Sequence, residues 1–181
     1  MPFLFDFLLF DSAKAEDHLE KARELNTTNK SLYLLKDYDP LQSVAPYLFS
    51  FQKDTVFADW FFKEGWNQNW GVLLFSTDKD FDHLYQHFRK FLMVKTEAGE
   101  QLYFRFYDPR VLRIFLATCD TDQLKEFFGP VEYFICEDED PDRALVFKFK
   151  KNILTTDRIP VTELFSKGDK EEKIPSRKFF T

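Results

Sequence analysis

Apolar and polar residues alternate in blocks along this chain, and the blocks predict strands that are separated by helices. Residues 3–10 form a nearly continuous apolar run, which is typical of a strand that is covered on both faces in the middle of a sheet. Apolar runs at 32–35, 44–51 and 70–75 predict three further strands. Because proline cannot donate a ladder hydrogen bond, Pro46 places the second of these at a sheet edge or a bulge.

Helical patterns lie between these apolar runs. Residues 13–25 have few β-branched side chains, and Ser12 is placed to cap them. Apolar residues recur at intervals of three and four from Asp54, where a helix opens, to Gly65, where it ends. The same spacing returns over residues 79–92. We therefore expect three helices in the first half of the chain.

The stretch that begins at residue 102 combines a strand signal with a helix start. Alternation over Leu102–Tyr107 predicts a strand with Arg105 and Tyr107 on one face. Asp108 is then placed as the N-cap and Pro109 as the first residue of the following helix. This corner therefore has a purely structural explanation for its aspartate and its proline.

One more helix and a hairpin follow. The helix begins after Asp120 and ends at the sequence Phe127-Phe128-Gly129-Pro130. Apolar runs at 131–136 and 144–149 predict an antiparallel hairpin around the acidic turn 137–142. That turn lacks the glycine and the alternating ligand spacing of a calcium loop, so we expect a solvated turn.

The length fits a single domain, because 181 residues fall within the roughly 100–200 typical of one. Residues 166–181 are polar, charged and without a periodic pattern until their last aromatic pair. We predict an α/β domain over residues 1–165, with a mixed β-sheet flanked by helices and a C-terminal hairpin. Residues 166–181 are predicted to be a charged tail.

The aromatic content is high and the glycine content low. Phe, Trp and Tyr make up 19% of the chain, whereas glycine occurs only 5 times. No Walker loop, dinucleotide-binding glycine pattern or nucleophile elbow is present, and each of these needs glycine for its backbone shape. Nucleotide-binding enzymes and serine hydrolases of these classes are therefore not indicated, and we expect no cofactor.

The charge of the chain argues against two kinds of partner. The formal net charge is −6 and the pI is about 5.2. Such a chain has no general electrostatic attraction for nucleic acid or for an anionic membrane, so we expect neither as a partner. No apolar stretch approaches the roughly 18 residues of a spanning helix.

Cysteine and histidine give no metal or disulfide signature. Cys119 and Cys136 are too few for a disulfide framework or a zinc site, which favours free thiols and a cytoplasmic location. His83 and His87 share one helix face, but the glutamate of a metalloprotease helix is missing. We expect two polar residues that flank an amphipathic face, and no metal.

Three tryptophans lie close together in the sequence. Trp60 lies on the apolar stripe of its helix and is expected in the core. Trp66 and Trp70 flank a polar helix-to-strand loop, where large rings are hard to bury. Trp66 therefore fits an interface and the core equally well.

The two arginines of the corner differ in what they suggest. Arg110 lies in a first helical turn, where the helix dipole disfavours a cation, so we expect a carboxylate or backbone partner in its own chain. Arg105 is left open between holding the corner and binding a partner. The residues considered for partner binding are Trp66, Arg105, Tyr107, Arg110 and the tail pair Phe179 and Phe180, which would anchor the tail on a bound partner.

At this corner the sequence resembles the domain-of-unknown-function 4123 family, whose members act as adaptor chaperones for effectors of the bacterial type VI secretion system. The block Phe104–Leu112 and the stop Phe127–Pro130 carry the resemblance most specifically. Shorter segments agree in the same order at 8–13, 45–48, 70–74 and 87–89. The resemblance covers about residues 3–135. It marks as structural motif residues Pro46, His87, Arg89, Asp108, Pro109, Gly129 and Pro130.

The resemblance implies a cytoplasmic, non-enzymatic protein that binds a secreted effector toxin and helps to load it onto the spike protein of the secretion tube. Two other functions remain open. One is an immunity-type protein that binds and inhibits a toxin through an acidic surface. The other is an enzyme whose site is assembled from scattered residues, which would be His87, Arg105, Tyr107, Asp108 and Arg110.

Overall fold

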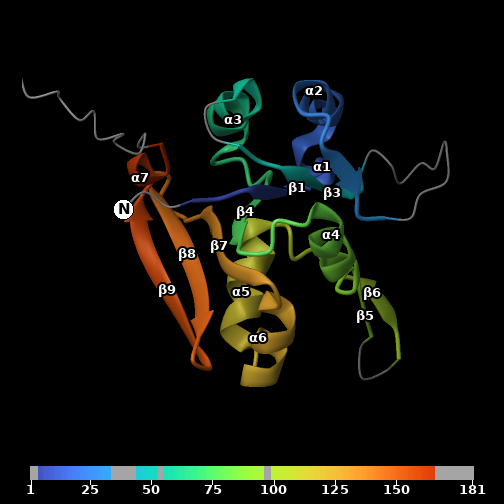
Figure 1. The fold of residues 1–181 in the computed structure, drawn as a ribbon, viewed down its shortest axis with the longest axis vertical. Coiled ribbons are helices and arrows are strands. Elements are labelled where there is room, and N and C mark those ends of the chain that lie inside the picture. The colour runs from blue at the N-terminus through green and yellow to red at the C-terminus, as the bar shows by residue number, and fades with distance from the viewer. Residues whose placement is uncertain (1–3, 34–43, 53–54, 96–98, 166–181) are drawn as a thin grey trace, which may run out of the picture.

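The computed structural model describes residues 4–33, 44–52, 55–95 and 99–165. A seven-stranded sheet runs through it, and Figure 1 shows its arrangement. The strand order is β2-β3-β1-β4-β7-β8-β9, and all six neighbouring pairs are antiparallel. The strands are β1 (Phe7–Asp11), β2 (Asn29–Ser31), β3 (Pro46–Ser50), β4 (Gly71–Ser76), β7 (Val131–Glu137), β8 (Arg143–Lys150) and β9 (Ile153–Pro160).

Helices cover both faces of this sheet, as Figure 1 shows. On one face lie α1 (Ser12–Ala15), the 3₁₀ turn η1 (Glu16–His18), α2 (Leu19–Leu25), α3 (Val56–Trp60) and the π-helical turn η3 (Phe61–Gly65). On the other lie α4 (Phe81–Arg89), α5 (Pro109–Thr118) and α6 (Thr121–Phe128). The short helix α7 (Thr162–Phe165) follows β9.

Strand β1 lies in the middle of the sheet, between β3 and β4. Its side chains alternate, so that Leu8 and Phe10 belong to the core under α2 and α3, whereas Phe7 and Leu9 belong to the core over α4–α6. All four side chains are at most 4% exposed. The prediction of a strand covered on both faces is therefore confirmed.

The α/β domain with one sheet flanked by helices and a closing hairpin, β7–β8, is confirmed. The sheet has no parallel pair among the described residues, so it is more uniform than the mixed sheet that we expected. Strand β9 is not predicted by the sequence pattern, because its middle residues, Thr155–Arg158, are all polar. This strand follows β8 through a tight turn in which Lys151 and Asn152 both adopt positive φ.

Pro46 does not lie in an edge strand, because β3 is paired on both sides. It is the first residue of β3, a position that tolerates proline, and its carbonyl accepts a hydrogen bond from the Leu32 N–H at 2.8 Å. The neighbouring strand β2 occupies Asn29–Ser31 rather than 32–35, and positions 34 and 35 lie outside the described residues.

Two helix starts also differ from expectation. Asp11, not Ser12, caps α1 by accepting from the Lys14 N–H, and the Ser12 hydroxyl donates to the Ala45 carbonyl. Thr55 caps α3, while Asp54 lies outside the described residues. Val56, the first apolar residue after Asp54, is 70% exposed, so it does not belong to the buried face of this helix. Asp108 caps α5, as predicted, and α6 begins after Asp120, as predicted, with Asp120 as its cap.

The strand predicted over Leu102–Tyr107 is wrong in its second half. Only Gln101–Tyr103 forms a strand, β6, and it pairs with β5 (Met93–Lys95) in a separate two-stranded ribbon. Residues 104 and 105 have no regular structure, and residues 106 and 107 form a turn in which both side chains are buried. The alternation that placed them on opposite faces therefore does not hold, because these side chains fill the core next to α5.

Gly129 ends α6 with φ of +47°, a conformation that favours glycine. A Cβ atom at this position would lie 2.4 Å from Cε1 of His87. The His87 ring is buried, and its Nε2 is 2.9 Å from the Phe127 carbonyl oxygen, so it has little room to move. Backbone geometry and close packing thus both require glycine here.

We expect Gly129→Ala to lower the free energy of unfolding by about 2–5 kcal/mol, because positive φ and overpacking each cost about 1–3 kcal/mol. Gly99→Ala is the matched control, since Gly99 has φ of +85° and open space around the added methyl group. It should show the backbone cost alone. Equal losses in chemical denaturation of the two variants would contradict the proposed contact with His87.

Candidate functional site

A chain of alternating charges holds the corner before α5. Asp11, at the end of β1, is completely buried, and its Oδ2 lies 2.5 Å from Nη2 of Arg105. The same Nη2 is 4.0 Å from Oδ2 of Asp108. Arg105 therefore links the end of β1 to the N-terminus of α5, and it lies 94 residues from Asp11 in sequence.

Arg110 adds a second cation to this chain of charges. Its Nε donates to Oδ1 of Asp108 at 3.0 Å and its Nη2 donates to Oδ2 at 2.6 Å. The Arg110 backbone N–H also donates to the same Oδ1 as the helix cap. The expected carboxylate partner of Arg110 is thus Asp108, which is 2% exposed.

The two aspartates have opposite pKa shifts. Burial raises the pKa of Asp11, because the loss of water outweighs the hydrogen bond and the charge of Arg105. Burial acts on Asp108 in the same direction, but the hydrogen bonds and charge of Arg110 hold its pKa below the usual range. Burial of the Asp11 carboxylate is therefore only partly offset by Arg105, whereas burial of the Asp108 carboxylate is more than offset by Arg110.

Tyr107 lies next to this chain of charges and is 2% exposed. Its hydroxyl is hydrogen-bonded to that of Tyr33, and burial raises the pKa of Tyr107 well above its usual value. A buried and partnered ring offers little surface to another protein. The structure therefore places Tyr107 in the core of the corner, not on a binding surface.

A hollow of 420 Å³ lies beside Arg110. It is lined by Asn67, Asn69, Arg110, Arg113, Glu137, Asp138, Glu139 and Pro141. The Glu137 carboxylate accepts the Asn69 N–H at 3.1 and 3.0 Å, and Arg113 donates to the Glu137 carbonyl at 3.0 Å. We predicted Glu137 to be part of a solvated turn, but it is 3% exposed and holds the loop that precedes β4.

Burial raises the pKa of Glu137 to about 7, and the bonds from the loop amides only partly offset this. The sequence does not indicate that Glu137 is buried and binds the loop amides, because an acid within a run of acids is expected to be exposed to solvent. The neighbouring acids Asp138 and Asp140 form ion pairs with Arg158 across the turn. Part of the acidic run is thus neutralised within the chain.

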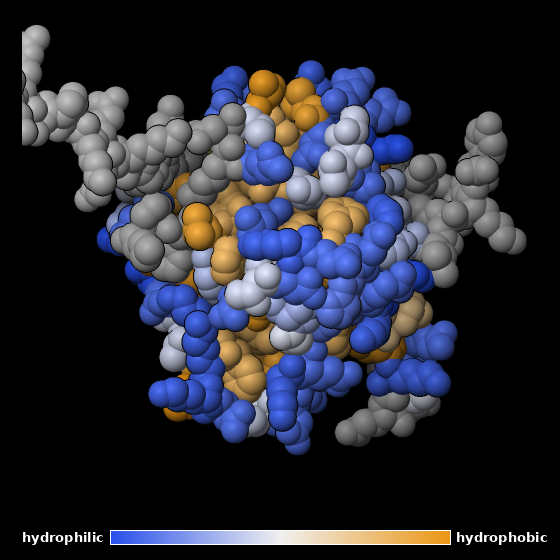
Figure 2. Space-filling view, viewed as in Figure 1, coloured by the Kyte–Doolittle hydropathy of each residue, from blue (hydrophilic) through white to orange (hydrophobic). Residues whose placement is uncertain are grey.

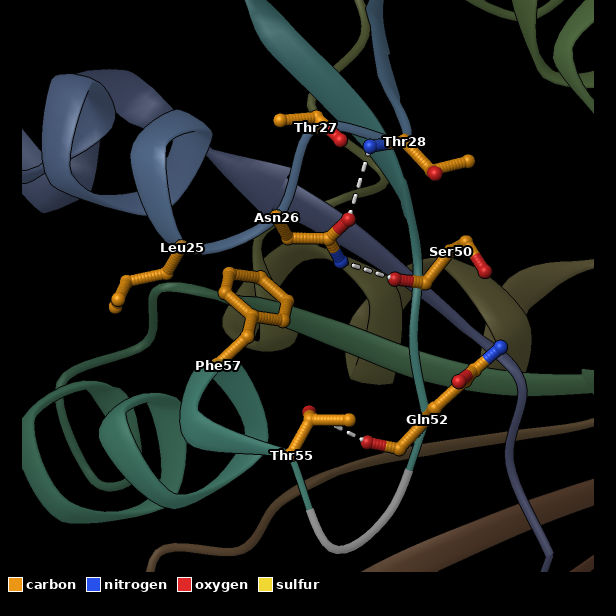
Figure 3. Close-up of a pocket in the computed structure, with 8 residues that line it drawn as sticks. All are labelled: Leu25, Asn26, Thr27, Thr28, Ser50, Gln52, Thr55 and Phe57. Atoms are coloured by element: carbon orange, nitrogen blue, oxygen red, sulfur yellow. Dashed lines mark hydrogen bonds between the residues drawn. The ribbon is translucent and has the colours of Figure 1, made fainter.

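A second hollow, of 220 Å³, opens between the end of α2 and the start of α3 (Figure 3). Asn26 donates from Nδ2 to the Ser50 carbonyl at 2.5 Å and accepts the Thr28 N–H at 3.0 Å. Thr55 donates to the Gln52 carbonyl at 2.8 Å. These polar groups join the helix ends to β3, and none of the predicted site residues lines the hollow.

Trp66 belongs to the core, so its interface alternative is not supported. It is 6% exposed, and its ring centroid lies 5.7 Å from that of Phe62. Trp60, predicted for the core, is partly buried against it. Phe179 and Phe180 lie outside the described residues.

The remaining motif residues make contacts within the domain. The Arg89 Nε donates to the Leu32 carbonyl at 3.2 Å, and the Pro130 carbonyl accepts from the Ser76 hydroxyl at 2.7 Å. His87 contacts α6 as described above, and burial lowers its pKa, whereas His83 pairs with Asp78. The two histidines thus have separate partners.

Two searches concern metals and membranes. Within the described ranges, no group of three or more His, Cys, Asp or Glu side chains is arranged to hold a metal ion. None of the helices in those ranges is long and apolar enough to cross a lipid bilayer.

We expect Arg105→Ala to lower the free energy of unfolding by about 2–4 kcal/mol, because it leaves the buried Asp11 carboxylate without its cation. Adding Asp11→Asn should recover part of this loss, since the stranded charge is then removed. Lys95→Ala, an exposed change, should stay within about 0.5 kcal/mol. Denaturant titration of these variants and of Asp11→Asn alone measures the losses, and fully additive losses from the Asp11 and Arg105 changes would contradict the pairing.

Glu137 should make stability depend on pH. Its pKa is about 7 when folded against an ordinary 4.5, so between these values the folded state binds more protons and stability falls as pH rises. The fall should be on the order of 3 kcal/mol between pH 4.5 and 7.5. Glu137→Gln should lack this component, as shown by the difference between the two denaturation curves across pH. Parallel curves would refute it.

The comparisons with known proteins agree with the motif at this corner. The family model described as domain of unknown function (DUF4123) matches residues 7–126, which is more than half of the chain. The matched span includes Asp11, Arg105, Asp108 and Arg110, and ends within α6. No curated protein and no solved structure matches significantly. The chain therefore belongs to the DUF4123 family.

Proposed function

We propose that this protein is a non-enzymatic adaptor chaperone that binds a type VI secretion effector in the bacterial cytoplasm and helps to load it onto the secretion spike protein. Family membership supports this proposal, because the chain resembles the adaptor chaperones of the family. The two free thiols, Cys119 and Cys136, are consistent with a reducing compartment.

One observation carries the proposal over an enzyme. Asp11 is paired with Arg105 and Asp108 with Arg110, so all four side chains are engaged within the chain at the start of α5. Of the five residues of the enzyme alternative, the hollow beside this corner includes only Arg110. These side chains hold the backbone in place and do not line a substrate pocket together. This arrangement supports a protein-binding scaffold over an enzyme.

The test is reconstitution with the product of a neighbouring gene that encodes a candidate toxin. We expect a stable complex in which the toxin keeps its activity, because an adaptor must deliver a functional effector. We also expect the spike protein to bind the toxin more tightly when this protein is present. Loss of toxin activity in the complex would favour the immunity alternative, and no complex with any neighbouring product would contradict both binding functions.

A further inference from the structure

The ribbon of β5 and β6 stands apart from the rest of the fold. It extends from the end of α4 and is not part of the seven-stranded sheet (Figure 1). All six of its residues are exposed. Four of them are large and apolar, with exposed fractions of 42% for Met93, 39% for Val94, 50% for Leu102 and 57% for Tyr103.

Both faces of this ribbon carry apolar side chains. Met93 pairs with Tyr103 on one face, and Val94 pairs with Leu102 on the other. Nine large apolar side chains are exposed among the described residues, and the other five are scattered over separate parts of the fold. Scattered apolar residues are normal on a surface, whereas a cluster of four on six residues marks an interaction site.

The root of the ribbon is fixed by packing. The Phe104 N–H donates to the Leu92 carbonyl at 2.9 Å, and the Phe104 ring lies 4.5 Å from that of Phe115 on α5. The Tyr103 ring lies 5.4 Å from that of Tyr33. Figure 2 shows hydrophobic surface at the lower right, where the ribbon leaves the body. A ribbon held in this way loses little conformational entropy when a partner binds.

The charges around the ribbon are positive in an otherwise acidic chain. Residues 89–105 contain four basic residues against Glu97 and Glu100, whereas the whole chain has a net charge of −6. Arg89, Lys90 and Lys95 have no carboxylate within ion-pair distance among the described residues. Arg89 donates to the Leu32 carbonyl, whereas Lys90 and Lys95 are exposed and can pair with acidic groups of a partner.

The ribbon also has unpaired backbone edges. Within the described part of the chain, each of its two strands has a neighbouring strand on one side only. Such an edge can accept one more strand, in which main-chain hydrogen bonds give affinity and alternate side chains give specificity. The most suitable occupant is therefore extended, apolar and bordered by carboxylates.

We propose that the β5–β6 ribbon is the effector-docking element, and that it binds an extended apolar segment of the effector flanked by acidic side chains. This inference rests on the proposed function. The apolar segment would contact Met93, Val94, Leu102 and Tyr103. Its flanking acidic side chains would pair with Lys90 and Lys95.

The test uses the full chain and the purified toxin that forms the complex described above. The variant Met93→Ser/Leu102→Ser should weaken binding by about 30-fold or more, the loss expected for interface hot spots. Lys90→Glu/Lys95→Glu should weaken it by about 10-fold and reduce its salt dependence. The matched control is Val56→Ser/Ile114→Ser, which removes two apolar side chains that are each 70% exposed elsewhere and should change affinity less than about 2-fold.

The outcomes separate this inference from the proposed function. If the wild-type chain binds the toxin and the ribbon variants bind equally well, the docking site is wrong while the function stands. If the wild-type chain binds no toxin, both fail. If the wild-type chain is a dimer by light scattering that the ribbon variant breaks, the occupant is a second copy and the inference is overturned.

A photo-crosslinking side chain at position 103 keeps the inference testable if a ribbon variant unfolds. We expect it to crosslink to an apolar toxin segment with neighbouring acids, and the same group at position 114 to give no crosslink. Crosslinks from position 114 without any from position 103 would overturn the assignment.

Discussion

The ion pair between the buried Asp11 carboxylate and the partly exposed Arg105 side chain is the constraint on which much of this fold depends. Asp11 ends β1 and caps α1, and its carboxylate is completely buried, where an unpaired charge is very costly. Arg105 brings the turn before α5 to this point, and Asp108 and Arg110 continue the alternation of charges. Helices α5 and α6 are thereby fixed against the face of the sheet opposite α2 and α3.

This arrangement explains why a family motif can be specific without being a site of chemistry. Asp108 caps a helix, Pro109 begins it, and Gly129 leaves room for His87. Each of these positions admits few residue types for steric or electrostatic reasons. The exposed apolar side chains of the β5–β6 ribbon are under no such structural constraint, which suits a surface that varies with its partner.

Much of the fold could be predicted from the sequence because local signals determine it. The apolar run of β1, the cap of α5 and the start of α6 were read correctly, since each depends on neighbouring residues. The errors lie where distant contacts decide. The alternation at Arg105 and Tyr107 predicts a strand, because no neighbouring residue indicates their hydrogen bonds with the distant Asp11 and Tyr33. Glu137 is buried, yet in the sequence it cannot be told from any other acid in a charged turn.

The central claim is that the motif corner holds the fold while the ribbon recognises the partner. Amide hydrogen exchange, compared between the free chain and its effector complex, tests both halves at once. The account predicts strong protection over residues 109–113 in both states and new protection over 93–95 and 101–103 in the complex. New protection at the start of α5, with the ribbon unchanged, would contradict it.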